Sequence, residues 1–246
     1  MIKTNVWLTK NQNGAGMKND EQNIDAKMRI YKVAVSLFAQ KGFYAVGVRE
    51  IAKEANVNIS MINYYYGGKI GILKEIITDA LNKYYQSMNV SVDESMPMEE
   101  RTEIMIKSMI KFFRENIELA MVAFNTMPFD IPEIVEHKIK LSENNRDSLK
   151  WFFENLGGDY NDPVQMGVLS GLLSNIILAH FENKYVWDRV KKMVGESKKI
   201  EEKTFEERIM QCCENEDEYY NKYAKMLAKL YFHGVPSIVT KNKKKE

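Results

Sequence analysis

The chain has 246 residues, of which 28% are charged and 45% hydrophobic, with a formal net charge of +1. This length allows one large or two modest domains, and the composition is ordinary for a soluble globular protein. No apolar run approaches the roughly 18 residues of a membrane span and no secretory signal is visible, so we expect a cytoplasmic protein without membrane contact.

Residues 1–22 are polar with little apolar periodicity, which predicts a flexible amino-terminal arm. The spacing of apolar residues then predicts a helix over 25–41, ended by Gly42. Gly47 follows in a short lead-in and can occupy the cap position of the next helix.

Residues 48–66 predict two short helices, 48–55 and 59–66, joined by a tight turn. Ala52 is small where the two helices would cross, and Asn56 tolerates the left-handed backbone of a turn. A crossed pair whose second helix carries polar and aromatic residues outward is typical of a DNA-binding helix-turn-helix. Ordinary helical bundles contain such pairs too, so the pattern alone leaves both readings open.

The flanking segments Ala34–Tyr44 and Gly67–Leu73, together with this helix pair, resemble the amino-terminal domain of the TetR/AcrR family of transcriptional regulators. The resemblance covers less than a quarter of the chain. It implies an all-α protein of about nine to ten helices, with a three-helix DNA-binding head at 23–68 and a larger ligand-binding and dimerisation body at 69–236. A basic tail, 237–246, would follow.

The resemblance places the DNA contacts on and around the second helix of the pair. Asn can bond adenine bidentately, and Tyr can contact phosphate or a thymine methyl group. Lys69 would favour a phosphate at the start of the next helix. The expected DNA-binding residues are Arg49, Ser60, Met61, Asn63, Tyr64, Tyr65 and Lys69.

The charge is distributed unevenly along the chain. Residues 1–74 contain 11 Lys and Arg against 5 Asp and Glu, whereas residues 75–246 contain 24 against 29. A basic first third beside an acidic remainder suits a phosphate-binding head on a separate body.

Amphipathic and apolar segments predict the helices of the body. They are 69–88, 98–116, 117–127, 132–156, 163–183 and 218–233, with short helices and a mobile connection over 184–216. Asp162 would cap the helix that Pro163 opens.

Methionine and aromatic residues are frequent in the helices that line the ligand pocket in the family. Methionine adapts its shape to varied apolar ligands, although ordinary core packing is the better explanation for any single one of these residues. The expected ligand-binding residues are Met105, Met109, Phe113, Met121, Phe124, Asn125, His137, Trp151 and His180.

The last two long helices form the dimer interface in the family. Small residues in the first of them would allow close helix approach. The expected interface residues are Gly167, Gly171, Ser174, Leu178, Tyr223, Leu227 and Leu230.

The sequence offers no catalytic constellation. Its three histidines lie in separate predicted helices without a metal-ligand companion, and no phosphate-cradling glycine loop follows a strand. We therefore expect no enzyme, cofactor or metal, and adjacent Cys212 and Cys213 do not suggest a disulfide framework.

The function that fits best is a homodimeric repressor released from a pseudo-palindromic DNA operator by a small apolar effector. The alternatives are a helical interaction protein that does not bind DNA, or an activator or architectural DNA-binding protein of the same fold.

Overall fold

The computed structural model describes residues 14–93, 95–155, 157–194, 209 and 213–234, and every regular element among them is helical. The chain divides into two compact units, Met1–Leu73 and Lys74–Glu246. The predicted tail 237–246, most of the connection after Val194, and residues 1–13 of the predicted arm lie outside the described residues.

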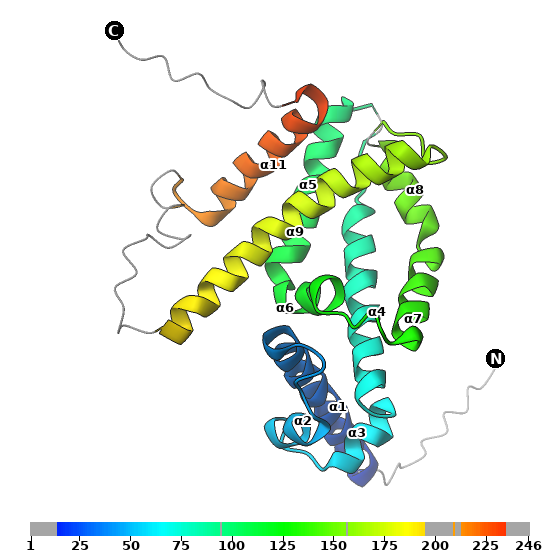
Figure 1. Cartoon of the computed structure of the whole chain (residues 1–246), viewed down its shortest axis with the longest axis vertical. Coiled ribbons are helices and arrows are strands. Elements are labelled where there is room, and N and C mark those ends of the chain that lie inside the picture. Colours follow the sequence, from blue (N-terminus) through cyan, green and yellow to red (C-terminus); the bar gives the residue numbers. More distant parts are fainter. Residues whose placement is uncertain (1–13, 94, 156, 195–208, 210–212, 235–246) are drawn as a thin grey trace, which may run out of the picture. The chain divides into compact units, whose positions relative to one another are not determined.

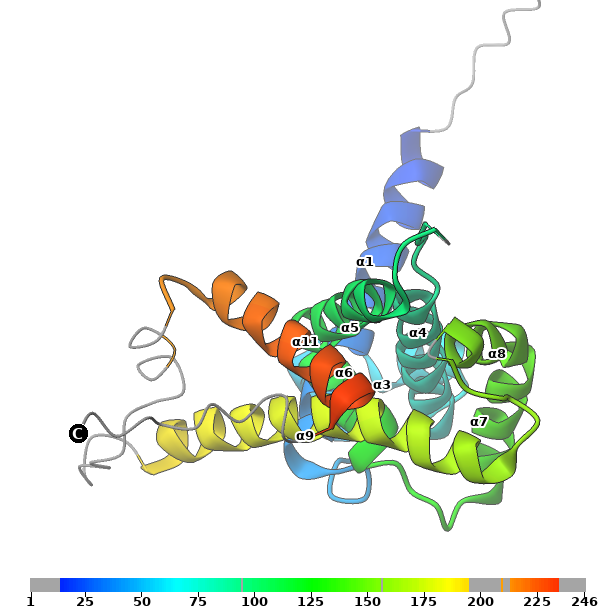
Figure 2. The ribbon, with the colours of Figure 1, turned by 90° about the horizontal axis from the view of Figure 1, so that it is seen from above.

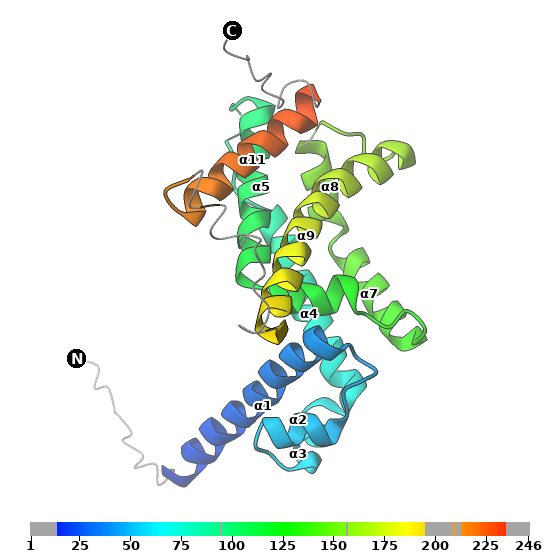
Figure 3. The same ribbon diagram turned by 60° about the vertical axis from the view of Figure 1, so that its left-hand side comes forward.

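Unit 1 contains three helices and the first turn of a fourth. They are α1 (Gly14–Lys41), α2 (Val48–Glu54), α3 (Ile59–Tyr66) and α4 (Lys69–Met88), and Figure 3 shows α1 to α3 gathered together. The start of α1 at Gly14 is earlier than the predicted 25. The buried residues Ile30, Phe38, Ile51 and Ile62 form the centre of this unit.

The turn between α2 and α3 has the expected conformation. Asn56 has φ +51°, and the Val57 N–H donates to the Ala52 carbonyl at 3.0 Å. Ala52 and Ala55 are buried where the helices cross. Arg29 of α1 donates from Nε to the Ala55 carbonyl at 3.1 Å. A side chain of α1 thus provides the hydrogen bond that this carbonyl at the end of α2 lacks within its own helix.

Unit 2 contains the remaining helices, drawn in Figure 1. They are α5 (Met98–Glu115), α6 (Ile117–Ala120), the π-helical η1 (Met121–Asn125), α7 (Pro132–Asn144), α8 (Arg146–Asn155), α9 (Pro163–Val194) and α11 (Glu216–His233). Among the described residues, no helix is both long and apolar enough to cross a lipid bilayer.

The core of unit 2 is built around Tyr84 of α4. Its ring lies 5.2–6.0 Å from those of Phe112, Phe113 and Phe124, and its hydroxyl donates to Ser174 Oγ at 2.8 Å. Burial raises the pKa of Tyr84 well above its usual value, so the hydroxyl stays protonated and available as a donor.

A series of polar contacts joins α4 to α7 and α8, which follow one another end to end alongside it (Figure 1). Lys74 pairs with Glu133, and Thr78 Oγ1 lies 2.8 Å from His137 Nε2. Further along, Tyr85 Oη donates to Ser142 Oγ at 3.1 Å and Asn89 Nδ2 to Ser148 Oγ at 2.8 Å. The partners of the four contacts are 57 to 59 residues apart in sequence, so the helices run in register.

Two helix predictions for the body are wrong in detail. The predicted helix 132–156 is broken at Asn145, whose side-chain amide donates to the Leu141 carbonyl at 2.8 Å. Asn side chains compete with the helical backbone in this way. The predicted helix 117–127 is instead a short α-helix followed by a π-helical turn.

Helix α9 continues to Val194, well past the predicted end at 183, and runs across α5 (Figures 1 and 2). Residues 184–194 contain four Lys and Arg residues and no Gly or Pro, so nothing in them interrupts a helix. The start of α9 is as predicted, since Asp162 Oδ1 accepts from the Val164 and Gln165 N–H groups at 2.8 and 3.2 Å.

Candidate functional site

The outward face of α3 presents the polar and aromatic residues that the sequence singled out. Ser60, Asn63 and Tyr64 are exposed, with Tyr64 81% exposed, while Met61 and Tyr65 are half-buried. The Tyr64 and Tyr65 rings meet edge to face at 5.0 Å. These residues therefore form one continuous polar and aromatic surface on α3.

Local contacts hold α3 in place behind this surface. Asn58, which the sequence reading missed as a cap, accepts the Ser60 N–H at 3.0 Å through its side chain. Ile62 is fully buried on the opposite face, and the Tyr66 hydroxyl donates to the Lys27 carbonyl of α1 at 2.8 Å. Gly67 ends the helix with φ +69°.

Lys69 lies at the amino terminus of α4, as expected for a phosphate-binding position. Its ammonium sits 4.0 Å from the centre of the Phe43 ring, and burial there lowers its pKa below the usual lysine value. Tyr44, 62% exposed and not predicted, has its ring 5.5 Å from that of Phe43. Lys69 and Tyr44 thus flank the same aromatic ring and add a cationic and a hydroxyl group to the site.

Arg49 projects from α2 and is exposed. Its helix begins at Val48, and Gly47 occupies the cap position without a side-chain hydrogen bond. Unit 1 therefore presents solvent-facing residues from α2, α3, the α1–α2 loop and the start of α4.

The residues predicted to bind a ligand fall into two groups. Met105, Met109, Phe113 and Met121 are buried among other core side chains. Phe124, Asn125, His137, Trp151 and His180 are half-buried.

Only part of this set is brought together. The Phe113 ring lies 6.2 Å from that of Phe124, and Asn125 is next to Met121. His137 instead contacts α4 through Thr78 and the Lys74 carbonyl. None of the predicted ligand residues lines the pocket of about 420 Å³ that opens beside α7 and α8.

His180 belongs to an aromatic cluster between α9 and α11. Its ring lies 5.9 Å from that of Tyr219, 5.8 Å from Tyr220 and 4.8 Å from Tyr223. Desolvation, with a smaller contribution from Lys184, lowers the pKa of His180 from 6.5 to about 4. Burial also raises the pKa of Tyr223 to about 12.

This cluster predicts a loss of stability in mild acid. His180 binds a proton near pH 6.5 in the unfolded chain but only near pH 4 in the folded protein. Its contribution to the free energy of unfolding is therefore complete above pH 6.5 and is lost as the pH falls from 6.5 to 4. After allowance for solvent screening we expect a loss of about 1–2 kcal/mol. Denaturant unfolding of wild type and His180→Phe at pH 7 and 4.5 measures it, and identical pH dependence in the two would contradict it.

The residues predicted for dimerisation differ in exposure. Gly167 is exposed, and Gly171, Leu178, Tyr223 and Leu230 are half-buried. Leu227 is buried within the subunit and Ser174 accepts the Tyr84 hydroxyl.

An apolar stripe that the sequence reading did not assign lies on the first half of α9. Val164, Val168 and Leu172 are 71%, 60% and 37% exposed, and they follow one another at four-residue intervals. Such spacing places them on one face of the helix.

Among the described residues, no group of three or more His, Cys, Asp or Glu side chains is arranged to hold a metal ion. The solvent-facing residues of unit 1 present hydrogen-bond donors, the Lys69 ammonium and the exposed Tyr44 and Tyr64 rings.

The first third of the chain is similar to known regulatory proteins. Residues 30–76 match the profile of "Bacterial regulatory proteins, tetR family". The chain is 38% identical over 68 residues to the "Probable HTH-type transcriptional regulator YttP" of Bacillus subtilis, a match covering 28% of this chain and 33% of that protein. It is 23% identical over 140 residues to the B. subtilis "Fatty acid metabolism regulator protein", covering 57% and 69%.

Solved structures agree with the fold over most of the chain. The fatty acid degradation regulator FadR of Bacillus halodurans superimposes with a TM-score of 0.57 at 16% identity, covering 86% of this chain and 97% of that one. FadR of B. subtilis in complex with stearoyl-CoA gives a TM-score of 0.57 at 15% identity, covering 85% and 98%. At these identities the likeness concerns the fold alone, and the sequence match to YttP spans a third of that relative's length.

Proposed function

We propose that the chain is a member of the tetR family of bacterial regulatory proteins, whose model matches residues 30–76, and that it is a ligand-responsive regulator of transcription that binds double-stranded DNA. The observation that carries the proposal is the solvent-facing surface of α3, where Asn63 and Tyr64 are exposed beside Lys69. A helix of this kind fits the major groove of duplex DNA.

Each residue of the surface has a role that its chemistry suits. Asn63 bonds an adenine edge, and Tyr64 places its hydroxyl on a phosphate or its ring on a thymine methyl group. Lys69 and the first N–H groups of α4 attract one phosphate oxygen. Arg49, Ser60, Met61 and Tyr65 complete the contact surface, and Tyr44 adds a hydroxyl beside Lys69.

The working form is a homodimer that reads two half-sites of a pseudo-palindromic operator. The exposed stripe of Val164, Val168 and Leu172 on α9 supports this assembly, because such apolar faces are unusual on a monomer and typical of subunit interfaces. Gly167, exposed on the same helix, leaves room for a close approach of the partner.

The regulator is a repressor that a small apolar effector releases from DNA. The effector binds unit 2 and lowers operator affinity by the difference in its affinity for the DNA-binding and released forms. The structural neighbour that holds stearoyl-CoA supports an effector with a long apolar portion, because it has the same fold. The family is one of regulators and not of enzymes, so we assign no reaction.

Two substitutions test the DNA surface. We expect Tyr64→Ala and Lys69→Ala each to weaken operator binding on the order of tenfold or more, because every dimer loses two contacts. Lys69→Ala should act equally on all DNA sequences, whereas Tyr64→Ala should also relax sequence preference if its ring touches a base. Gel-shift titration measures both effects.

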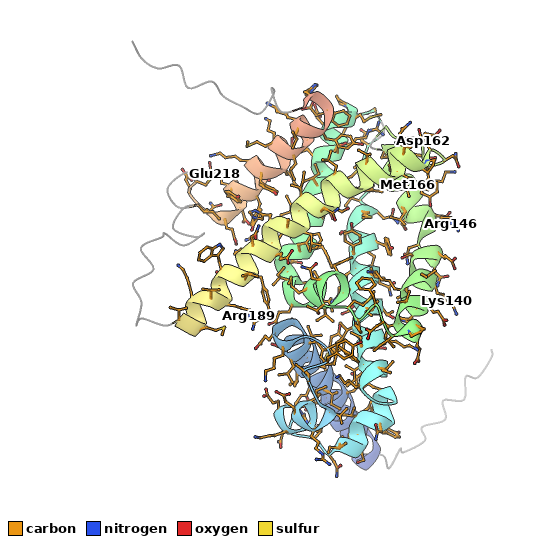
Figure 4. The ribbon with its side chains drawn as sticks, in the orientation of Figure 1. Lys140, Arg146, Asp162, Met166, Arg189 and Glu218 are labelled. Carbon is orange, nitrogen blue, oxygen red and sulfur yellow. The ribbon has the colours of Figure 1, made fainter. Side chains whose placement is uncertain are left out.

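Lys140→Ala is the matched control, since Lys140 is an exposed lysine of α7 in unit 2 (Figure 4). It should leave the affinity unchanged. If both Tyr64→Ala and Lys69→Ala bind the operator with wild-type affinity, the proposed DNA-contact surface is wrong.

Selection of bound fragments from genomic DNA separates the alternatives. A regulator enriches a small number of palindromic sites, whereas an architectural protein enriches none in particular. A helical interaction protein without DNA affinity retains no fragments at all, and that outcome would overturn the proposal.

A further inference from the structure

A pocket of about 420 Å³ opens in unit 2 beside the break between α7 and α8. Its volume is in the range that small organic ligands occupy. Much of its wall is apolar, from Phe129, Val135, Ile139, Leu149 and Tyr160. Phe129 and Ile139 are 67% and 53% exposed, so apolar surface faces solvent at this place.

The wall of this pocket also contains the side chain of Lys138. Its ammonium lies 5.7 Å from the centres of the Phe124 and Phe129 rings, and it donates to the Ala123 carbonyl at 3.3 Å. Within the described ranges, no carboxylate lies close enough to form an ion pair with it. Burial lowers the pKa of Lys138, which reflects the cost of holding an uncompensated charge among apolar groups.

The Lys138 ammonium therefore provides the pocket with a positive charge and with hydrogen-bond donors. An ammonium has three N–H donors, and the Ala123 carbonyl uses one of them. Arg146, at the start of α8, adds a second cation to the wall, while Glu143 contributes one carboxylate. The pocket thus combines an apolar surface with a net positive lining.

We propose that this pocket binds an organic anion with an apolar body, and that Lys138 holds the anionic group. The inference rests on the proposed function, because it names the chemical class of the effector. The apolar body lies against Phe129, Ile139 and Leu149, and the anion supplies the charge partner that Lys138 lacks among its described neighbours.

The pocket is connected to the series of polar contacts along α4. Ser142 lines the pocket, and its hydroxyl accepts the hydrogen bond from Tyr85 Oη of α4 at 3.1 Å. A ligand that contacts Ser142 therefore acts on a residue that α4 also uses, which gives the pocket a direct contact with that helix.

Calorimetric titration of the full chain with decanoate tests the assignment. Decanoate should bind, and decyltrimethylammonium, which has the same chain length and the opposite charge, should bind at least tenfold more weakly. Lys138→Met keeps the apolar stem and removes the charge, so it should weaken decanoate binding on the order of tenfold. Glu143→Gln should strengthen it, because it removes the one carboxylate of the wall.

Lys140→Met is the matched control, because Lys140 is exposed two positions away on α7 and does not line the pocket (Figure 4). It should bind decanoate as the wild type does. Lys138→Met should also keep or raise the thermal midpoint of unfolding, since it removes a partly buried charge without an ion-pair partner. Failure of decanoate to bind, equal binding of the two amphiphiles, or wild-type affinity in Lys138→Met would each overturn the proposal.

Binding to operator DNA is measured in a separate experiment. Without decanoate, Lys138→Met should bind operator fragments as the wild type does. If the wild type binds decanoate through Lys138 but retains no DNA, the proposed function fails and the pocket assignment stands. If DNA is bound but Lys138→Met leaves decanoate affinity unchanged, the pocket assignment alone fails.

Discussion

Replacing Gly71 with alanine should destabilise unit 1 by about 3 kcal/mol or more, at the upper end of what overpacking costs. A Cβ atom at this position would lie 1.6 Å from the carbonyl oxygen of Tyr66, the last residue of α3. A backbone atom cannot turn aside as a flexible side chain can, so α3 and α4 would have to separate. Because α3 carries Asn63 and Tyr64, operator binding should be lost with the fold.

Denaturant unfolding followed by circular dichroism measures the change in stability, and gel shift measures the loss of DNA binding. Gly47→Ala is the control within the same unit. Its Cβ would meet nothing within 4 Å and its φ is −98°, so we expect a cost below about 1 kcal/mol. Equal unfolding midpoints for Gly71→Ala and wild type would show that α3 and α4 are not packed as closely as described.

We also expect operator affinity to fall on the order of a thousandfold between about 50 and 200 mM salt, if each dimer neutralises about six phosphates. The reason is that cations of unit 1 displace counterions condensed on DNA. Residues 1–74 hold 11 Lys and Arg against 5 Asp and Glu, which supplies the necessary charge. Fluorescence anisotropy with a labelled operator at several salt concentrations gives the slope.

Lys69→Gln provides the internal comparison for this slope. Loss of one phosphate contact per subunit should lower the slope of log affinity against log salt by about two per dimer. Lys140→Gln, which removes an exposed charge from unit 2, should leave it unaltered. An affinity that does not depend on salt would contradict the phosphate-binding role of unit 1.

The sequence predicts unit 1 well because its signals are local. The small Ala52, the left-handed Asn56 and the helix-ending Gly42 each act within one turn of their own position, and the structure confirms all three. The exposure of Asn63 and Tyr64 follows from the same short-range periodicity. Their DNA contacts stay predictions.

Unit 2 could be predicted only as a set of helices. The break at Asn145 depends on one side-chain amide bonding the preceding turn, which charge and hydropathy patterns do not reveal. The lengthening of α9 to Val194 has a similar cause, since Lys184 at the predicted break is fixed by an ion pair with Glu216 of α11 at 2.6 Å.

The candidate pocket could not be predicted from the sequence for a different reason. Met105 and Met109 are fully buried in the core, although their residue type suits a ligand cavity equally well. Lys138 reads in the sequence as one more solvated lysine, because only the tertiary packing places its ammonium beside the Phe124 and Phe129 rings. Which side chains remain accessible is decided by contacts between distant segments.

The four polar contacts between α4 and the α7–α8 pair limit how these helices can slide past one another. Directional hydrogen bonds tolerate little sliding, and Thr78–His137 and Lys74–Glu133 would be lost together if either helix shifted by a fraction of a turn. A shift by a full helical turn would not restore the set, because Leu141 and Phe152 stand one turn beyond His137 and Ser148 and offer no side-chain acceptor. The four contacts therefore favour a single register, and we expect α4 to move together with α7 and α8 and not to slide along them.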